Sequence, residues 1–107
     1  MAVVLVVDDE AMIRSLTEKV LKKGGHTVVM AENGEDAITV FSEQGGTFSI
    51  VILDLSLPGI SGTDLLRKLR AIRSDIPCIL SSGFPMTMAD VPEDIRPGTS
   101  FLQKLCA

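Results

Sequence analysis

The stretch IVILDLSLPGISG, residues 50–62, decides the fold. Its first four residues form a continuous apolar run, which is typical of a strand buried on both faces of a sheet. The run ends on Asp54 and leads into a turn that contains Pro58-Gly59. A second apolar run, Val3–Val7, ends in the same way on Asp8-Asp9-Glu10. Two buried strands that both end in carboxylates predict an acidic pocket at one edge of a sheet, of the kind that binds a divalent cation.

Strand-like and helix-like patterns alternate along the chain. Apolar residues recur at helical spacing within Ala11–Lys23, and Gly24-Gly25 then stops that helix. Connections this short force neighbouring strands to run parallel, with right-handed crossovers. The sequence therefore predicts an α/β fold, an open five-stranded parallel sheet with helices on both faces. The other expected strands are Thr27–Ala31, Ser49–Leu53, Cys78–Ser82 and Ser100–Gln103, and the other expected helices begin near Gly34 and after a cap formed by Ser61 and Asp64.

The C-terminal part leaves little room for helices. Pro85, Pro92 and Pro97 confine a fourth helix to Met86–Val91 at most, and no residues remain for a fifth helix after the last strand. A parallel sheet needs cover on both faces, and a bare flank exceeds what soluble monomers usually expose. We therefore expect the chain to self-associate as a homodimer through the helix Ala11–Lys23.

Composition and charge narrow the class of protein. The 107 residues suffice for one domain, residues 1–107, and 46% hydrophobic with 22% charged residues is typical of a soluble globular protein. A net charge of −4 without a Lys/Arg stripe disfavours direct nucleic-acid binding. No apolar run approaches the roughly 20 residues that span a bilayer, and no basic segment precedes the first apolar run. Cys78 and Cys106 indicate reduced thiols, so we expect a cytoplasmic protein.

Five polar residues are expected at one edge of the sheet. In open α/β sheets, ligands bind beyond the carboxyl ends of the strands, where the strand order reverses. If the first and third strands are central neighbours, Asp8, Asp9 and Asp54 meet there, and Ser82 and Lys104 end the fourth and fifth strands at the same edge. Clustered carboxylates repel one another, and Mg²⁺ relieves that repulsion. One carboxylate can then attack a phosphoryl donor to give an acyl phosphate.

Over essentially its whole length, the chain resembles the receiver domain of the bacterial two-component response regulator family. The resemblance is carried by Val6-Val7-Asp8-Asp9-Glu10, Asp54-x-x-Leu57-Pro58-x-x-x-Gly62, Ser82-Gly83 and Lys104 after an apolar strand. It implies a flavodoxin-like sheet in the order 2-1-3-4-5. It also implies a phosphoacceptor that receives its phosphoryl group from a histidine kinase or a histidine phosphotransfer protein. Such a domain would catalyse only its own phosphorylation and dephosphorylation. The tail Phe101-Leu102-Gln103-Lys104 is similar to receivers attached to hybrid histidine kinases.

The resemblance assigns roles to the acidic residues. Asp54 would be the phosphoacceptor and Asp9 a direct Mg²⁺ ligand. Asp8 would act on the metal largely through water, and the backbone carbonyl of Ser56 would complete the protein ligands.

It also assigns roles at the ends of the last two strands. The hydroxyl of Ser82 would move toward the phosphoryl group, and Lys104 would pair with that group. Phe101 would be the aromatic residue whose orientation reports the phosphorylation state. The chain departs from the family at Leu105, because a proline usually follows the lysine.

Simpler readings stay open for each residue and for the whole chain. Asp8-Asp9-Glu10 could only cap the first helix, Asp54 could be a turn residue, and Ser82 and Lys104 taken alone would be solvent-facing. A degenerate receiver could keep the fold and act only through protein contacts. A phosphohydrolase with an aspartyl nucleophile usually needs a second Asp two residues later, where this chain has Ser56.

Overall fold

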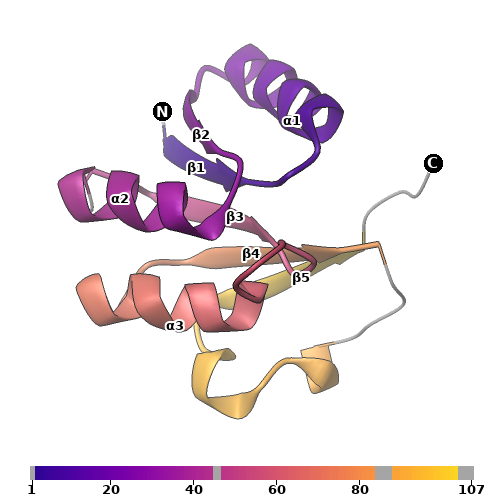
Figure 1. The fold of residues 1–107 in the computed structure, drawn as a ribbon. Coiled ribbons are helices and arrows are strands. Elements are labelled where there is room, and N and C mark those ends of the chain that lie inside the picture. The colour runs from indigo at the N-terminus through magenta and orange to yellow at the C-terminus, as the bar shows by residue number, and fades with distance from the viewer. Residues whose placement is uncertain (1, 45–46, 84–87, 104–107) are drawn as a thin grey trace.

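The computed structural model describes residues 2–44, 47–83 and 88–103, and it shows a parallel sheet between helices (Figure 1). The sheet has five strands in the order β2-β1-β3-β4-β5, so the predicted α/β architecture and strand order are confirmed. The strands are β1 Val3–Val7, β2 Thr27–Ala31, β3 Ile50–Asp54, β4 Cys78–Ser82 and β5 Thr99–Gln103, and the α-helices are α1 Ala11–Lys23, α2 Gly34–Gln44 and α3 Gly62–Ile72.

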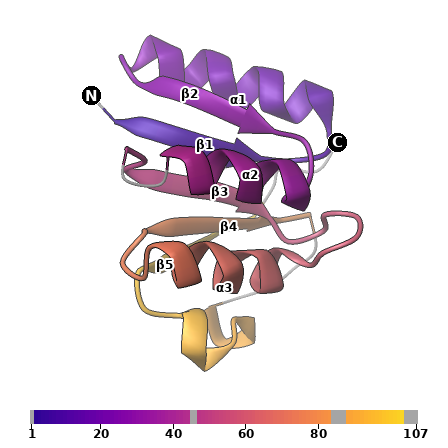
Figure 2. The same ribbon diagram turned by 60° about the vertical axis from the view of Figure 1, so that its left-hand side comes forward.

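The helices cover the two faces of the sheet unequally. Figures 1 and 2 show α2 and α3 together on one face and α1 on the other. The face beneath α2 and α3 holds the main core, in which Leu5, Leu53 and Leu80 are fully buried. Their strand neighbours one residue away point to the α1 face, because side chains alternate along a strand. There Ile52 and Ile79 are only half-buried, so α1 covers that face incompletely.

Local signals set the helix ends. The hydroxyl of Ser61 accepts a hydrogen bond from the backbone N–H of Asp64 at 3.2 Å, which confirms the predicted cap of α3. After α1 the chain turns at Gly24 and at Gly25, whose φ of 84° favours glycine.

Two strands have bounds that differ from the sequence prediction by one residue. β3 runs from Ile50 to Asp54 rather than from Ser49 to Leu53, because Asp54 still pairs with Ser81 of β4. Likewise β5 begins at Thr99 rather than Ser100, since Thr99 pairs with Cys78. Strand ends depend on the partner strand, which the pattern of one strand does not contain.

The described part of the segment between β4 and β5 contains no α-helix, in line with the restriction predicted from its prolines. It holds two 3₁₀ turns, Met88–Asp90 and Glu93–Ile95. The second turn was not expected, and Pro92 precedes it as its N-cap. Ile95 of this turn is buried and fills the core next to α3. Among the described helices, none has the length and apolar character needed to cross a membrane.

Candidate functional site at the carboxyl edge of the sheet

Asp8 and Asp54 lie side by side at the carboxyl edge of the two central strands. Val7 of β1 is level with Leu53 of β3 in the parallel register, so the next residue of each strand is an aspartate. Both side chains are buried, with 3% of Asp8 and 2% of Asp54 exposed. Burying two carboxylates at adjacent positions is costly unless hydrogen bonds or a cation compensate. The predicted acidic edge therefore exists for these two residues.

The carboxylate of each of the two aspartates accepts a backbone hydrogen bond from the residue two positions later in the chain. A carboxylate oxygen of Asp54 accepts the backbone N–H of Ser56 at 2.9 Å. A carboxylate oxygen of Asp8 accepts the backbone N–H of Glu10, also at 2.9 Å. This Asx-turn geometry orients each carboxylate and bends the chain away from the sheet.

A cluster of carboxylates stands at the end of β1. One oxygen from each of Asp8, Asp9 and Glu10 lies within 4.8 Å of the others, with Asp8 buried and the other two exposed. Glu10 is the N-cap of α1 and makes no side-chain capping bond, so capping does not account for its side chain in this cluster. Three hard oxygen donors at this spacing fit Mg²⁺, which combines a few carboxylate oxygens with water. Glu10 was not among the ligands predicted from the sequence, although it directly follows the two aspartates.

Arg14 links α1 to the acidic residues at the end of β1. Its guanidinium donates a hydrogen bond to the backbone carbonyl of Asp8 at 2.6 Å and lies 3.8 Å from a carboxylate oxygen of Glu32. Only 17% of its side chain is exposed, so the bond is shielded from water. Sequence analysis did not single out Arg14, and its position one turn after Glu10 is the signal that could have found it.

The loop after Asp54 has little space for side chains. A Cβ added to Gly62 would lie 2.7 Å from the backbone oxygen of Asp54 and 2.7 Å from the Cα of Leu55. Gly59 has a φ of 84°, which favours glycine. Leu57 turns into the core, with 7% of its surface exposed. The spacing of leucine, proline and glycine in this loop thus follows from how closely it folds back over β3.

Ser82 ends β4 and is fully buried. The reading of Ser82 as a solvent-facing residue is therefore wrong. Its strand neighbour Ser81 pairs with Asp54, so Ser82 lies one residue further toward the carboxyl edge. On the other side Ser82 pairs with Gln103 of β5. Lys104 lies outside the described residues.

Phe101 lies in β5 opposite Leu80 of β4 and is half-buried. It packs against the main core at its edge.

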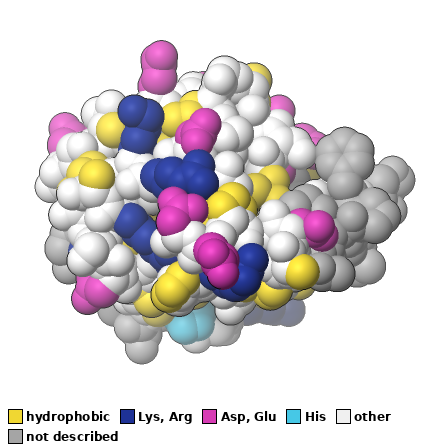
Figure 3. All heavy atoms as spheres, turned by 90° about the horizontal axis from the view of Figure 1, so that it is seen from below, with side chains coloured by type: hydrophobic (Ala, Val, Ile, Leu, Met, Phe, Trp, Pro, Cys, Tyr) yellow, Lys and Arg dark blue, Asp and Glu magenta, His cyan; other side chains and the backbone are white. Residues whose placement is uncertain are grey.

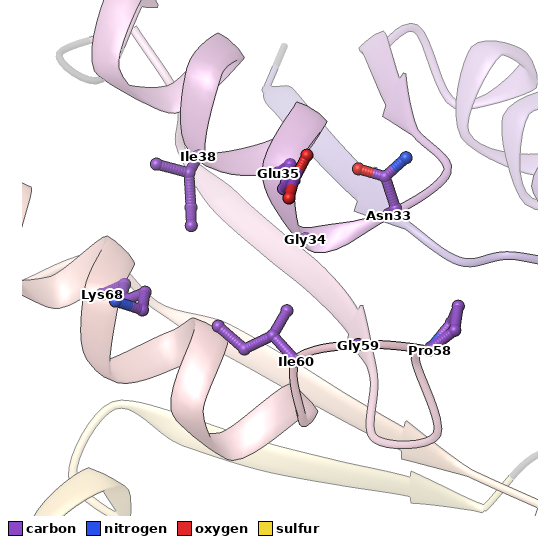
Figure 4. Close-up of a pocket in the computed structure, with 8 residues that line it drawn as sticks. All are labelled: Asn33, Gly34, Glu35, Ile38, Pro58, Gly59, Ile60 and Lys68. Atoms are coloured by element: carbon purple, nitrogen blue, oxygen red, sulfur yellow. The ribbon is translucent and has the colours of Figure 1, made fainter.

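A pocket opens beside the acidic edge rather than within it. It has a volume of about 650 Å³ and lies between the start of α2, the β3–α3 loop and α3 (Figure 4). Glu35 and Lys68 stand on opposite sides of it, and Ile60 reaches toward Gly34. A Cβ on Gly34 would come within 2.1 Å of a methyl group of Ile60. The lining residues are Asn33, Gly34, Glu35, Ile38, Pro58, Gly59, Ile60 and Lys68.

Charges of both signs alternate on the face seen in Figure 3. Arg67 of α3 bridges Asp64 at 2.8 Å and Asp94 at 2.7 Å. The hydrogen bond from Arg67 lowers the pKa of the Asp94 carboxyl.

Known proteins share both the sequence and the fold. The response regulator receiver domain family matches residues 4–104. The sensor kinase CckA of Brucella abortus is 39% identical over 83 residues, which make up 78% of this chain and 9% of CckA. The response regulator TrrA of Thermotoga maritima, solved with Mg²⁺ and BeF, superposes with a TM-score of 0.82 at 33% identity, over 97% of this chain and 87% of TrrA. A complex of the histidine kinase ThkA with TrrA gives a TM-score of 0.80 at 32% identity, over 97% of this chain and 86% of that one. This chain therefore belongs to the response regulator receiver domain family of two-component systems.

Proposed function

We propose that Asp54 accepts a phosphoryl group from a histidine kinase or a histidine phosphotransfer protein. The observation that carries the proposal is the placement of Asp54, buried at the end of a central strand beside Asp8 and the Asp8-Asp9-Glu10 cluster. The backbone N–H of Ser56 fixes the orientation of its carboxylate. A fixed carboxylate beside a cation site is arranged for in-line attack on a phosphorus atom.

The reaction forms one bond and breaks another. A carboxylate oxygen of Asp54 bonds to phosphorus while the bond from phosphorus to the donor histidine nitrogen breaks, and that nitrogen leaves with the electron pair. Bound Mg²⁺ would neutralise charge on the transferring group. Asp9 would hold the metal directly, Asp8 largely through water, and the Ser56 carbonyl would be the last protein ligand. The buried Ser82 hydroxyl would donate to a phosphoryl oxygen and Lys104 would pair with another.

The histidine-containing partner follows from the family and from one relative. TrrA was solved in complex with the histidine kinase ThkA. For this chain, a donor of the same chemical class is the proposal that its fold and acidic edge support.

A degenerate receiver is not favoured, because Asp8, Asp9 and Asp54 are all present at the edge where phosphoryl chemistry would take place. A phosphohydrolase is disfavoured by Ser56, which stands where a second catalytic Asp would be needed.

Intact-protein mass spectrometry tests the proposal. After incubation with acetyl phosphate and Mg²⁺, the wild-type protein should gain the mass of one phosphoryl group, and Asp54→Asn should gain none. The matched control is Asp75→Asn, which removes an exposed carboxylate between the C-terminal end of α3 and the start of β4 and should leave the modification intact. Modification of Asp54→Asn to the wild-type level would contradict the assignment.

A further inference from the structure

The loop between β3 and α3 connects the proposed phosphoacceptor Asp54 to the start of α3. The loop closes at its base, where the backbone N–H of Gly62 donates a hydrogen bond to the carbonyl of Leu55 at 3.3 Å. In its first half Leu57 is buried in the main core. In its second half Ile60 is partly buried and packs against the same core. Side chains on both halves of the loop therefore hold it against the body of the protein.

Ile60 also contacts the first residue of α2. A Cβ added to Gly34 would lie 2.1 Å from the Cγ2 methyl group of Ile60. Figure 4 shows the Ile60 side chain pointing toward Gly34 at the edge of the pocket. Gly34 is buried, and the absence of a Cβ is what lets the methyl group come this close. The start of α2 and the β3–α3 loop are therefore in direct contact.

The β2–α2 turn, residues 31–34, contacts the acidic end of β1 as well. Its first residue, Ala31, accepts the backbone N–H of Asp8 through its carbonyl oxygen at 3.2 Å. Its last residue, Gly34, lies against Ile60. The turn thus bridges the chain that follows β1 and the loop that follows β3. These two segments are the two halves of the acidic edge.

The α2 side of this contact is more rigid than the loop side. The side-chain oxygen of Asn33 accepts the backbone N–H of Asp36 at 2.8 Å, which caps α2 and fixes its first turn. On the loop side, Gly59 directly precedes Ile60 and is exposed. A group added at Gly34 should therefore displace Ile60, rather than the start of α2.

We propose that the β2–α2 turn positions the metal site, with Ile60 as the positioning residue that holds the loop bearing Ser56 against Gly34. Because Ser56 is a metal ligand only in the proposed function, this role of Ile60 rests on that proposal. The contact reduces the number of conformations open to the loop and keeps Ser56 beside Asp54, whose carboxylate accepts the Ser56 N–H at 2.9 Å. Loss of the contact should weaken metal binding more than it weakens the fold.

The Mg²⁺ affinity of Gly34→Ala tests the contact. The new Cβ displaces the Ile60 methyl group, so isothermal titration should show an Mg²⁺ affinity about ten-fold weaker than that of the wild type. The matched control is Gly24→Ala, the same change at the C-terminal end of α1, where the new Cβ would lie 3.2 Å from the ring of His26. This control should keep the wild-type affinity. Equal affinities in Gly34→Ala and the wild type would overturn the proposal.

A second substitution tests whether Ile60 carries the effect. Leucine has no branch at Cβ, so Ile60→Leu removes the methyl group that the new Cβ at Gly34 meets. The double variant Gly34→Ala with Ile60→Leu should therefore bind Mg²⁺ more tightly than Gly34→Ala alone. Ile60→Ala, which removes the contact from the loop side, should bind it more weakly than the wild type. A double variant that binds no better than Gly34→Ala would overturn the role of Ile60.

Hydrogen exchange separates this role from the proposed function, because it needs no metal. In the metal-free protein, Gly34→Ala should speed exchange of the Ser56 N–H several-fold relative to that of Val51, whose N–H bonds to the carbonyl of Pro77. Nuclear magnetic resonance measures both rates. Unchanged exchange at Ser56 would overturn the positioning role even if Asp54 is phosphorylated. A wild-type protein without Mg²⁺ affinity would overturn the metal site and the positioning role together.

Discussion

Asp8 and Asp54 occupy equivalent places on neighbouring parallel strands, and both are almost fully buried. Asp8 directly follows Val7, the last residue of β1, and Asp54 is the last residue of β3. A carboxylate oxygen of each aspartate accepts the backbone N–H of the residue two positions later, at 2.9 Å. The two carboxylates are thus held by the same local geometry at adjacent positions. This arrangement concentrates negative charge in the folded state, which a cation would relieve.

Magnesium should stabilise the fold through Asp8. Near saturation we expect Mg²⁺ to raise the free energy of unfolding of the wild type by about 1–3 kcal/mol, because the unfolded chain has no preformed site. Asp8→Asn keeps the oxygen that accepts the N–H of Glu10 but removes the charge, so this variant should gain little from Mg²⁺. Thermal unfolding followed by circular dichroism measures the effect, since the chain has no Trp or Tyr. An equal Mg²⁺ shift in both proteins would remove Asp8 from the site.

Arg14 should position the acidic cluster. Arg14→Met loses the shielded bond to the Asp8 carbonyl, which we expect to cost about 1–3 kcal/mol of stability and to weaken Mg²⁺ binding about ten-fold. Arg14→Lys should restore part of both. Isothermal titration with Mg²⁺ measures the affinity.

The control for Arg14 is Arg73→Met. Arg73 donates a comparable bond to the backbone carbonyl of Phe48, just before β3 and away from the carboxyl edge. This variant should lose stability while keeping the wild-type Mg²⁺ affinity. An unchanged Mg²⁺ affinity in Arg14→Met would show that Arg14 only stabilises the fold.

Gly62 should tolerate alanine less well than Gly34, although the contact at Gly34 is closer. The new Cβ at Gly34 meets a methyl group of Ile60, whose side chain can rotate, whereas the new Cβ at Gly62 meets backbone atoms of Asp54 and Leu55. We expect losses of about 1 kcal/mol for Gly34→Ala and about 3 kcal/mol for Gly62→Ala. Urea unfolding of the two variants compares them, and the reverse order would show that the loop after Asp54 moves easily.

Cys78 should make stability depend on alkaline pH. Burial raises the pKa of its thiol from an ordinary value of 9.0 to about 12. Below pH 9 the thiol is neutral in both the folded and the unfolded state, so its stabilising contribution to the free energy of unfolding is complete. Above pH 9 the unfolded thiol ionises while the folded one stays protonated, and this contribution is progressively lost. Above that pH, stability should fall by up to about 1.4 kcal/mol per pH unit more in the wild type than in Cys78→Ala. Urea unfolding across this range measures the slopes, and equal slopes would contradict a buried neutral thiol.

The sequence predicts the order of elements along the chain well, because strand-like and helix-like patterns alternate and Gly or Pro separates many of them. It also places Asp8 and Asp54 at one edge, since parallel strands bring their carboxyl ends together. Long-range contacts of flexible side chains leave no such pattern. The pairing of Arg67 with Asp94, 27 positions apart, and the bond from Arg14 to the Asp8 carbonyl depend on how the finished fold brings the chain together.

The burial of Ser82 was also not readable from its neighbours in sequence. The residues Ser81-Ser82-Gly83 carry no apolar pattern that indicates burial, but β4 lies between β3 and β5 and carries Ser82 inside the sheet. Likewise, the sequence pattern of α1 shows an apolar side, but which of its residues are exposed depends on how the helix packs on the sheet.

Locating the modified residue tests the central claim most directly. After phosphorylation with acetyl phosphate and Mg²⁺, borohydride reduces an aspartyl phosphate to homoserine, and peptide mass spectrometry then identifies the position. We predict homoserine at position 54 and unmodified aspartate at Asp8 and Asp9. Homoserine at Asp8 or Asp9, or no conversion at position 54 in a protein that has gained phosphoryl mass, would contradict the assignment of Asp54 as the phosphoacceptor.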